Sequence, residues 1–121
     1  MLVNCLAVGV GGFIGSVLRY LCGVVAPDSA FPWTTLAINV AGSFALALIA
    51  GLVLRGALAD GEFSLMLRVG LCGGFTTFST FSLETASLAS GGAVAGAAAY
   101  AVVTVALCVL AAFAGGWLAR A

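Results

Sequence analysis

Long apolar stretches, interrupted by only a few short polar segments, constrain this chain more than any other feature. Charged residues make up 7% of the sequence, whereas 64% of its residues are hydrophobic. Soluble domains carry about a quarter charged residues, and a chain this short has too few charges to cover a water-facing surface. The sequence therefore predicts an integral membrane protein. Its zero net charge also argues against nucleic-acid binding.

Four segments are long enough to cross a bilayer as helices, which takes about 20 apolar residues each. Polar breaks fall at PDSAFP and GALADGE, and the expected spans cover residues 2–26, 33–55, 63–90 and 91–118. We expect the first span to be permanent, since it lacks the basic start and cleavage site of a signal peptide. The predicted fold is a single all-α membrane domain of four transmembrane helices.

The placement of the arginines gives only a weak indication of orientation. With four spans, both termini share one side with Arg55, Arg68 and Arg120, whereas Arg19 belongs to the other. The positive-inside rule acts through Lys and Arg in short loops, and no lysine adds to this count. A bias this weak permits insertion in both orientations, and the three-to-one excess is a mild objection to that interpretation.

The third expected span contains CGGFTTFSTFSLE, residues 72–84, which crowds hydroxyl side chains near mid-membrane. Five hydroxyls fall within seven residues, directly after Gly73 and Gly74. Back-bonding to the helix's own carbonyls explains one or two of them, and a merely kinked packing helix is the alternative. Paired glycines weaken a helix, and exposed backbone is tolerated at this depth only inside protein or beside water. The pattern favours a helix with a break that lines an ion site.

Two other spans carry polar residues at four-residue spacing, which places each set on one helix face. The two stripes are Thr35, Asn39 and Ser43 in the second span and Tyr100, Thr104 and Cys108 in the fourth. Either stripe alone is explained by hydrogen bonding between helices. Together with a broken helix, they indicate a polar, uncharged pathway suited to an anion. Phe75, Phe78 and Phe81 repeat every three residues, either as ordinary packing or with positive ring edges turned to that anion.

The four cysteines stand singly in apolar surroundings, and the chain contains no histidine. Zinc, iron–sulfur and disulfide frameworks are therefore not expected. No nucleophile–base pair or phosphate-binding loop is evident either, so we do not expect an enzyme.

Three stretches carry a family resemblance: GGFIGSVLRY in the first span, INVAGSF in the second and GLCGGFTTFSTFSLE in the third. With them, the chain closely resembles the CrcB/Fluc family of fluoride channels. The resemblance implies a small four-helix protein of the bacterial inner membrane that assembles as an antiparallel, dual-topology homodimer. It implies passive export of toxic fluoride through two pores, and hence fluoride resistance.

The resemblance also implies roles for individual residues. The implied fluoride pore is lined by Asn39, Phe78, Ser79, Thr80, Phe81, Tyr100 and Thr104. Arg19 is expected at the pore vestibule. Gly73 and Thr76 are expected to offer backbone carbonyls to a structural sodium ion (Na+) at the dimer centre. Cys108 departs from the family, in which a serine is common, and a thiol is a weak donor.

Two other functions compete with the channel. A small proton-coupled multidrug transporter is also a four-helix antiparallel dimer, but it needs a carboxylate in mid-membrane. Glu84 lies near the end of its span, where we assign it to structure or to the vestibule. A purely structural membrane subunit is the second alternative, and it leaves the hydroxyl-rich break without a purpose.

Overall fold

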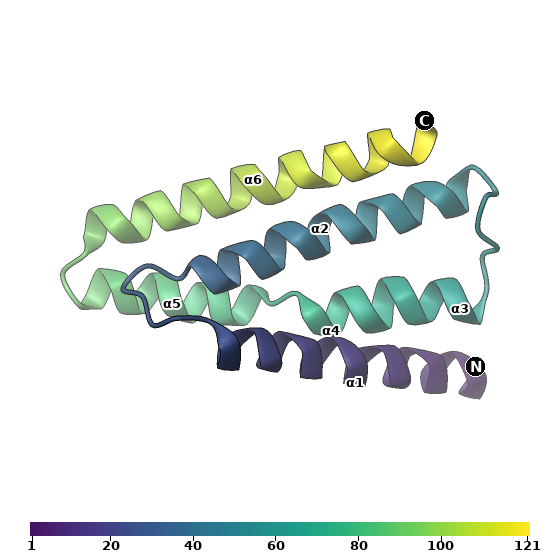
Figure 1. Ribbon diagram of the computed structural model, residues 1–121, viewed down its shortest axis with the longest axis horizontal. Helices are drawn as coiled ribbons and strands as arrows, with labels where there is room; N and C mark the ends of the chain where they lie inside the picture. Colours follow the sequence, from purple (N-terminus) through teal and green to yellow (C-terminus); the bar gives the residue numbers. More distant parts are fainter.

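The computed structural model describes residues 1–121 and contains only helices and their connections. The elements are α1 (Leu2–Val25), α2 (Trp33–Leu54), α3 (Glu62–Leu65), the π-helical η1 (Met66–Cys72), α4 (Gly73–Phe75), α5 (Phe78–Ser90) and α6 (Val94–Arg120). The helices α1 and α2, the run from α3 to α5, and α6 cross the molecule in alternating directions, so that both termini lie at the same end (Figure 1).

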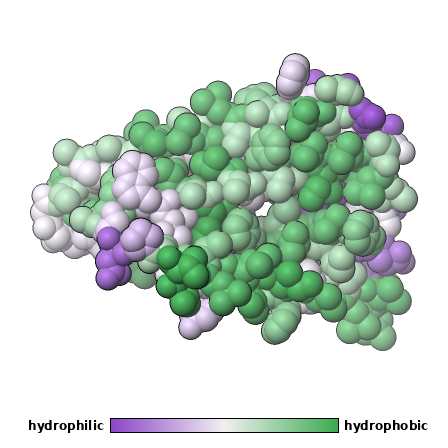
Figure 2. Space-filling view, viewed as in Figure 1, coloured by the Kyte–Doolittle hydropathy of each residue, from purple (hydrophilic) through white to green (hydrophobic).

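Three of these helices, α1, α2 and α6, are each long and apolar enough to cross a membrane. Large apolar side chains such as Phe13, Leu110 and Phe113 are exposed on the isolated chain. Figure 2 shows the hydrophobic surface over the middle of the molecule, with the hydrophilic residues gathered towards its ends. An exposed apolar middle is stable in lipid, where helices satisfy their own backbone groups. The prediction of an all-α membrane protein is confirmed.

Glycines bring α1 against the helical run of η1 and α4. A Cβ atom at Gly70 would lie 2.7 Å from the carbonyl oxygen of Val8, and one at Gly74 would lie 2.6 Å from that of Gly12. Real Cβ atoms do not approach backbone this closely, so the contact requires glycine at both positions. Small residues permit such close approach between membrane helices, and they fix α1 to this segment.

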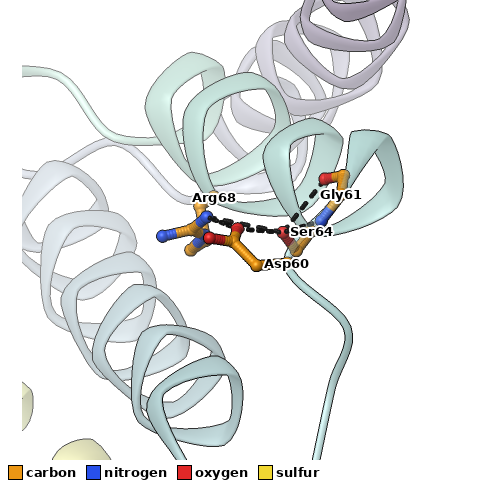
Figure 3. Close-up of polar contacts among 4 residues, drawn as sticks. All are labelled: Asp60, Gly61, Ser64 and Arg68. Atoms are coloured by element: carbon orange, nitrogen blue, oxygen red, sulfur yellow. Dashed lines mark hydrogen bonds and ion pairs between the residues drawn. The ribbon is translucent and has the colours of Figure 1, made fainter. Parts of the chain in front are cut away.

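A polar cluster anchors the start of α3 (Figure 3). The buried Ser64 hydroxyl accepts from the amide of Gly61 at 3.3 Å and lies 3.2 Å from a carboxylate oxygen of Asp60. The same carboxylate pairs with Arg68 at 2.8 Å. The cluster supplies partners for first-turn backbone groups that have none inside the helix, so it defines where this helical run begins.

The helical run that begins with α3 ends at Phe75, and α5 begins at Phe78. Thr76 and Thr77 between them are extended, with φ/ψ of −79°/156° and −151°/112°. The carbonyl of Cys72 accepts both the amide of Thr76 at 3.0 Å and its hydroxyl at 2.8 Å. Thr77 then caps α5, since its hydroxyl accepts from the amide of Thr80 at 3.1 Å. Both threonines therefore stabilise the interruption through their own side chains.

Candidate functional site

Asn39 holds the interruption in place from the neighbouring helix α2. Its Oδ1 accepts from the backbone amide of Thr77 at 2.8 Å, and its Nδ2 donates to the carbonyl of Thr77 at 3.1 Å. The side chain is buried. Unpaired backbone groups away from water are unfavourable, and this one amide satisfies both groups of Thr77. Asn39 is thus a two-point clamp on the extended residues.

The clamp changes the environment of two backbone carbonyls, those of Gly73 and Thr76. In a continuous helix, these carbonyls accept from the amides of the residues four positions later. Here the amide of Thr77 donates to Asn39, and the amide of Thr80 donates to the Thr77 hydroxyl. Both carbonyls therefore lose their usual helical donor and can accept from another group or coordinate a cation.

Arg19 of α1 reaches the same region of the backbone. Its Nε donates to the carbonyl of Gly74 at 3.1 Å, and the Ser16 hydroxyl lies 3.5 Å from that oxygen. A guanidinium stabilises the negative end of a helix at its last carbonyls. The Nη atoms of Arg19 make no hydrogen bond within the chain, so they retain donors for another partner.

A cavity of about 280 Å³ opens beside the interruption. We call it the Asn39 cavity, and its walls combine amide, hydroxyl, thiol and aromatic groups without any charged side chain. It is lined by Asn39, Ser43, Thr76, Thr77, Phe78, Phe81, Thr104, Val105, Cys108 and Val109. A water molecule occupies about 30 Å³ in the liquid, so the cavity has room for several waters or for a small hydrated ion.

The hydroxyl of Thr104 has no hydrogen-bond partner in the protein, although the residue is only 4% exposed. Buried polar groups are nearly always paired. Because Thr104 lines the Asn39 cavity, the contents of that cavity are the available partner. The Thr104 hydroxyl is thus an unpaired donor in the wall of this cavity.

The predicted pore residues divide into two groups. Four of them, Asn39, Phe78, Phe81 and Thr104, lie together at the Asn39 cavity. The other three, Ser79, Thr80 and Tyr100, do not line it. The Thr80 hydroxyl accepts from Thr77 at 3.0 Å, and Ser79 lies 3.4 Å from the same Thr77 oxygen.

Tyr100 belongs to a network that sequence reasoning did not find. The tyrosine is fully buried and donates to one oxygen of Glu84 at 2.7 Å, while Thr35 donates to the other oxygen at 2.7 Å. Glu84 thereby links α2, α5 and α6. The signal that could have found it is a carboxylate in an apolar chain, since such a group needs hydrogen-bonding partners. The Tyr100 ring also packs on Phe81, at 5.2 Å between centroids.

Comparisons with known proteins agree on one family. The family model described as CrcB-like protein, Camphor Resistance (CrcB), matches residues 6–116. The chain is 46% identical over 120 residues to the fluoride-specific ion channel FluC of Chelativorans sp. (strain BNC1), covering 97% of this chain and 96% of that protein. It is 45% identical over 122 residues to FluC of Agrobacterium fabrum, with 98% of each chain covered. It is also 47% identical over 121 residues to FluC of Nitrobacter winogradskyi, covering 95% and 94% respectively.

Proposed function

The chain belongs to the CrcB family, and we propose that it is a fluoride-specific ion channel that exports fluoride passively and so gives fluoride resistance. It is a multi-pass membrane protein, which in bacteria places it in the inner membrane. A channel moves its ion without making or breaking covalent bonds, so an enzymatic activity is not part of the proposal.

The uncharged polar Asn39 cavity is the observation that carries this proposal. Its hydroxyl and amide groups offer donors to an anion, and the unpartnered hydroxyl of Thr104 is one of them. The cavity includes Thr77 and Phe78 at the start of α5. A helix N-terminus favours negative charge, while the absence of a fixed cation in the cavity lets a bound anion leave again.

The two phenylalanines supply the second element of the proposed anion site. Phe78 and Phe81 both line the cavity, with ring centroids 5.6 Å apart and planes inclined at 52°. The edge of an aromatic ring is electropositive. Rings turned edge-on to a small anion stabilise it while leaving little room for water, which favours fluoride in a narrow path. Ser79, Thr80 and Tyr100 would continue that path beyond the cavity.

We propose that the pores are completed in an antiparallel, dual-topology homodimer. The Phe78 side chain is 78% exposed on the single chain and Ser79 is exposed beside it. Phe78 is predicted to line the pore, and its exposure on the single chain is consistent with a second copy that covers it. Three of the four crossings are the helices α1, α2 and α6, and the fourth would be the interrupted run from α3 to α5.

A sodium ion fits the two carbonyls of Gly73 and Thr76. Both oxygens lack their usual helical donor, and uncharged oxygens are suitable ligands for a hard cation. Two chains related by a two-fold axis would offer four such oxygens. Bound there, sodium would neutralise the carbonyl dipoles and stabilise the interruption, without itself crossing the membrane.

We propose that Arg19 lies at the pore vestibule and attracts anions there with the guanidinium nitrogens that do not bond to Gly74. One nitrogen, Nε, is occupied by that carbonyl. The remaining donors carry positive charge and would raise the local concentration of anions. Its bond to α4 would also keep that charge at a fixed depth.

The multidrug-transporter alternative is less consistent with Glu84. Proton exchange with a cationic substrate needs a carboxylate that is free to exchange partners. Both oxygens of Glu84 instead accept short hydrogen bonds, from Thr35 and Tyr100. The carboxylate is therefore better suited to holding three helices together.

Fluoride efflux from liposomes tests the proposal. The purified protein would be reconstituted with internal potassium fluoride, and valinomycin would balance charge while electrodes follow fluoride and, in parallel vesicles, chloride. We expect rapid fluoride release that requires valinomycin and no matching chloride release. Folded protein that releases neither ion, or both at equal rates, would overturn the proposed selectivity.

A further inference from the structure

We infer that Cys108 makes the Asn39 cavity a covalent binding site for small, neutral organomercury compounds, and that this modification blocks the pore. The block rests on the proposed function, whereas the chemical modification can be measured by itself. Cys108 is the cysteine that lines this cavity. The inference depends on its position, on the neighbouring Thr104 and on the chemistry of the thiol.

Cys108 and Thr104 lie one turn apart on α6 and open into the same cavity. The buried hydroxyl of Thr104 has no partner in the protein, which indicates that the cavity admits a ligand at this level of the helix. Cys108 is partly exposed, so a small molecule in the cavity can reach its sulfur. The site is thus defined by an unpaired donor as well as by the thiol.

The other cysteines lie elsewhere. Cys72 is buried and Cys5 is exposed near the start of α1. Cys22 lines a separate, apolar groove between α1 and α2. Modification of Cys5 or Cys22 therefore leaves the Asn39 cavity open, which makes these two cysteines internal controls.

The reaction favours a neutral reagent because no charged side chain lines the cavity and Val105 and Val109 lie in its wall with Cys108. A thiol sulfur is a soft ligand that prefers soft metals. With methylmercury chloride, the sulfur–hydrogen bond and the mercury–chlorine bond break and a sulfur–mercury bond forms. One proton and one chloride ion are released, and no atom is oxidised or reduced.

The adduct changes both the size and the wetting of the cavity. It replaces a small thiol by a bulky apolar group in a space of about 280 Å³. It also covers the wall next to Thr104, which supplies an unpaired donor. Apolar constrictions close pores by expelling water, so an anion would lose its path.

The experiment measures fluoride efflux and protein mass on the same proteoliposomes, before and after methylmercury chloride. We expect the wild-type efflux rate to fall at least about tenfold, with the adduct mapped to Cys108 and the rate restored by dithiothreitol. Whatever its starting rate, Cys108→Ser should show the same efflux rate before and after the reagent. The matched control Cys5→Ser/Cys22→Ser should be blocked like the wild type.

Separate results distinguish the possible failures. Unchanged efflux with Cys108 fully modified would overturn the block, and Cys108 left unmodified while Cys5 reacts would overturn the site. Wild-type protein that releases no fluoride before treatment would overturn the proposed function and the block with it. If Cys108→Ser fails to fold, Cys108→Ala and the reversal of the wild-type block by dithiothreitol provide the same test.

Discussion

The helical segments on either side of Thr76 and Thr77 differ in what they contact. The preceding run, Glu62–Phe75, packs its backbone against α1 through glycines. The following helix α5 packs against α6 through side chains and carries phenylalanines, hydroxyls and a carboxylate. The first segment makes fixed packing contacts with α1, whereas the second carries the side chains that we propose to line the pore.

The difference explains how so small a chain can hold extended backbone at membrane depth. Backbone-to-backbone contact leaves little freedom to the first segment, so the residues after it start from a fixed point. Asn39 then fixes Thr77 from a second helix. We conclude that the interruption is held from both sides, and that Phe78 and Phe81 of α5 are placed at the Asn39 cavity as a consequence.

Gly15→Leu should have the largest effect on stability, since it disrupts the packing of α1 against the segment Glu62–Phe75. A Cβ atom at Gly15 would meet the carbonyl of Leu71 and lie 2.8 Å from the amide nitrogen of Phe75. Because these backbone atoms cannot move aside without disturbing the helix, we expect the free energy of unfolding to fall by on the order of 3 kcal/mol. Little monodisperse protein should then appear on gel filtration. Gly9→Leu, on the same helix with nothing within 4 Å, is the control. Equal yields of the two variants would contradict the packing argument.

Asn39→Asp should abolish fluoride efflux while leaving most of the protein folded. The substitution keeps one acceptor for the amide of Thr77 but removes the donor to its carbonyl, and it adds negative charge to the cavity. Efflux from liposomes measures the first effect and gel filtration the second. Normal efflux by Asn39→Asp would show that Asn39 does not belong to the pore.

Glu84→Gln should have an intermediate effect, on stability more than on assembly. One of the two donors, Thr35 or Tyr100, would face an amide group in place of a carboxylate oxygen. Loss of a hydrogen bond costs about 1 kcal/mol, which thermal unfolding in detergent can detect. Tyr100→Phe removes one of the same bonds, so the loss of stability in the double variant should be smaller than the sum of the losses in the two single variants. Strict additivity would indicate that the network is not coupled.

Asp60→Asn should have the smallest effect. The Asp60 side chain is 71% exposed and that of Arg68 27%, and exposed pairs contribute about 0–1 kcal/mol. We expect a small loss in thermal stability that disappears at high salt, with fluoride efflux unchanged. A large loss of efflux would mean that this end of the molecule is part of the pathway.

The apolar stretches of the sequence were sufficient to predict helices and a membrane location, because a bilayer imposes their length and composition. The four-residue spacing also placed Asn39 and Thr104 on faces that meet at one cavity. The partners of Glu84 could not be predicted in the same way. Thr35 and Tyr100 lie on two different helices, and only the packing of those helices determines which polar groups meet. The clamp on Thr77 likewise depends on the depth at which α2 passes the interruption.

Phe75→Ile and Phe78→Ile, compared by fluoride efflux from liposomes, test the central claim most directly. The two residues flank the interruption, but Phe75 faces apolar grooves beside α1 and α2, whereas Phe78 lines the Asn39 cavity. We expect Phe78→Ile to stop fluoride efflux and Phe75→Ile to retain most of it, with both proteins folded. Retained efflux in Phe78→Ile, or equal loss in both variants, would contradict the claim that α5 carries the pore residues while the segment before it serves only packing.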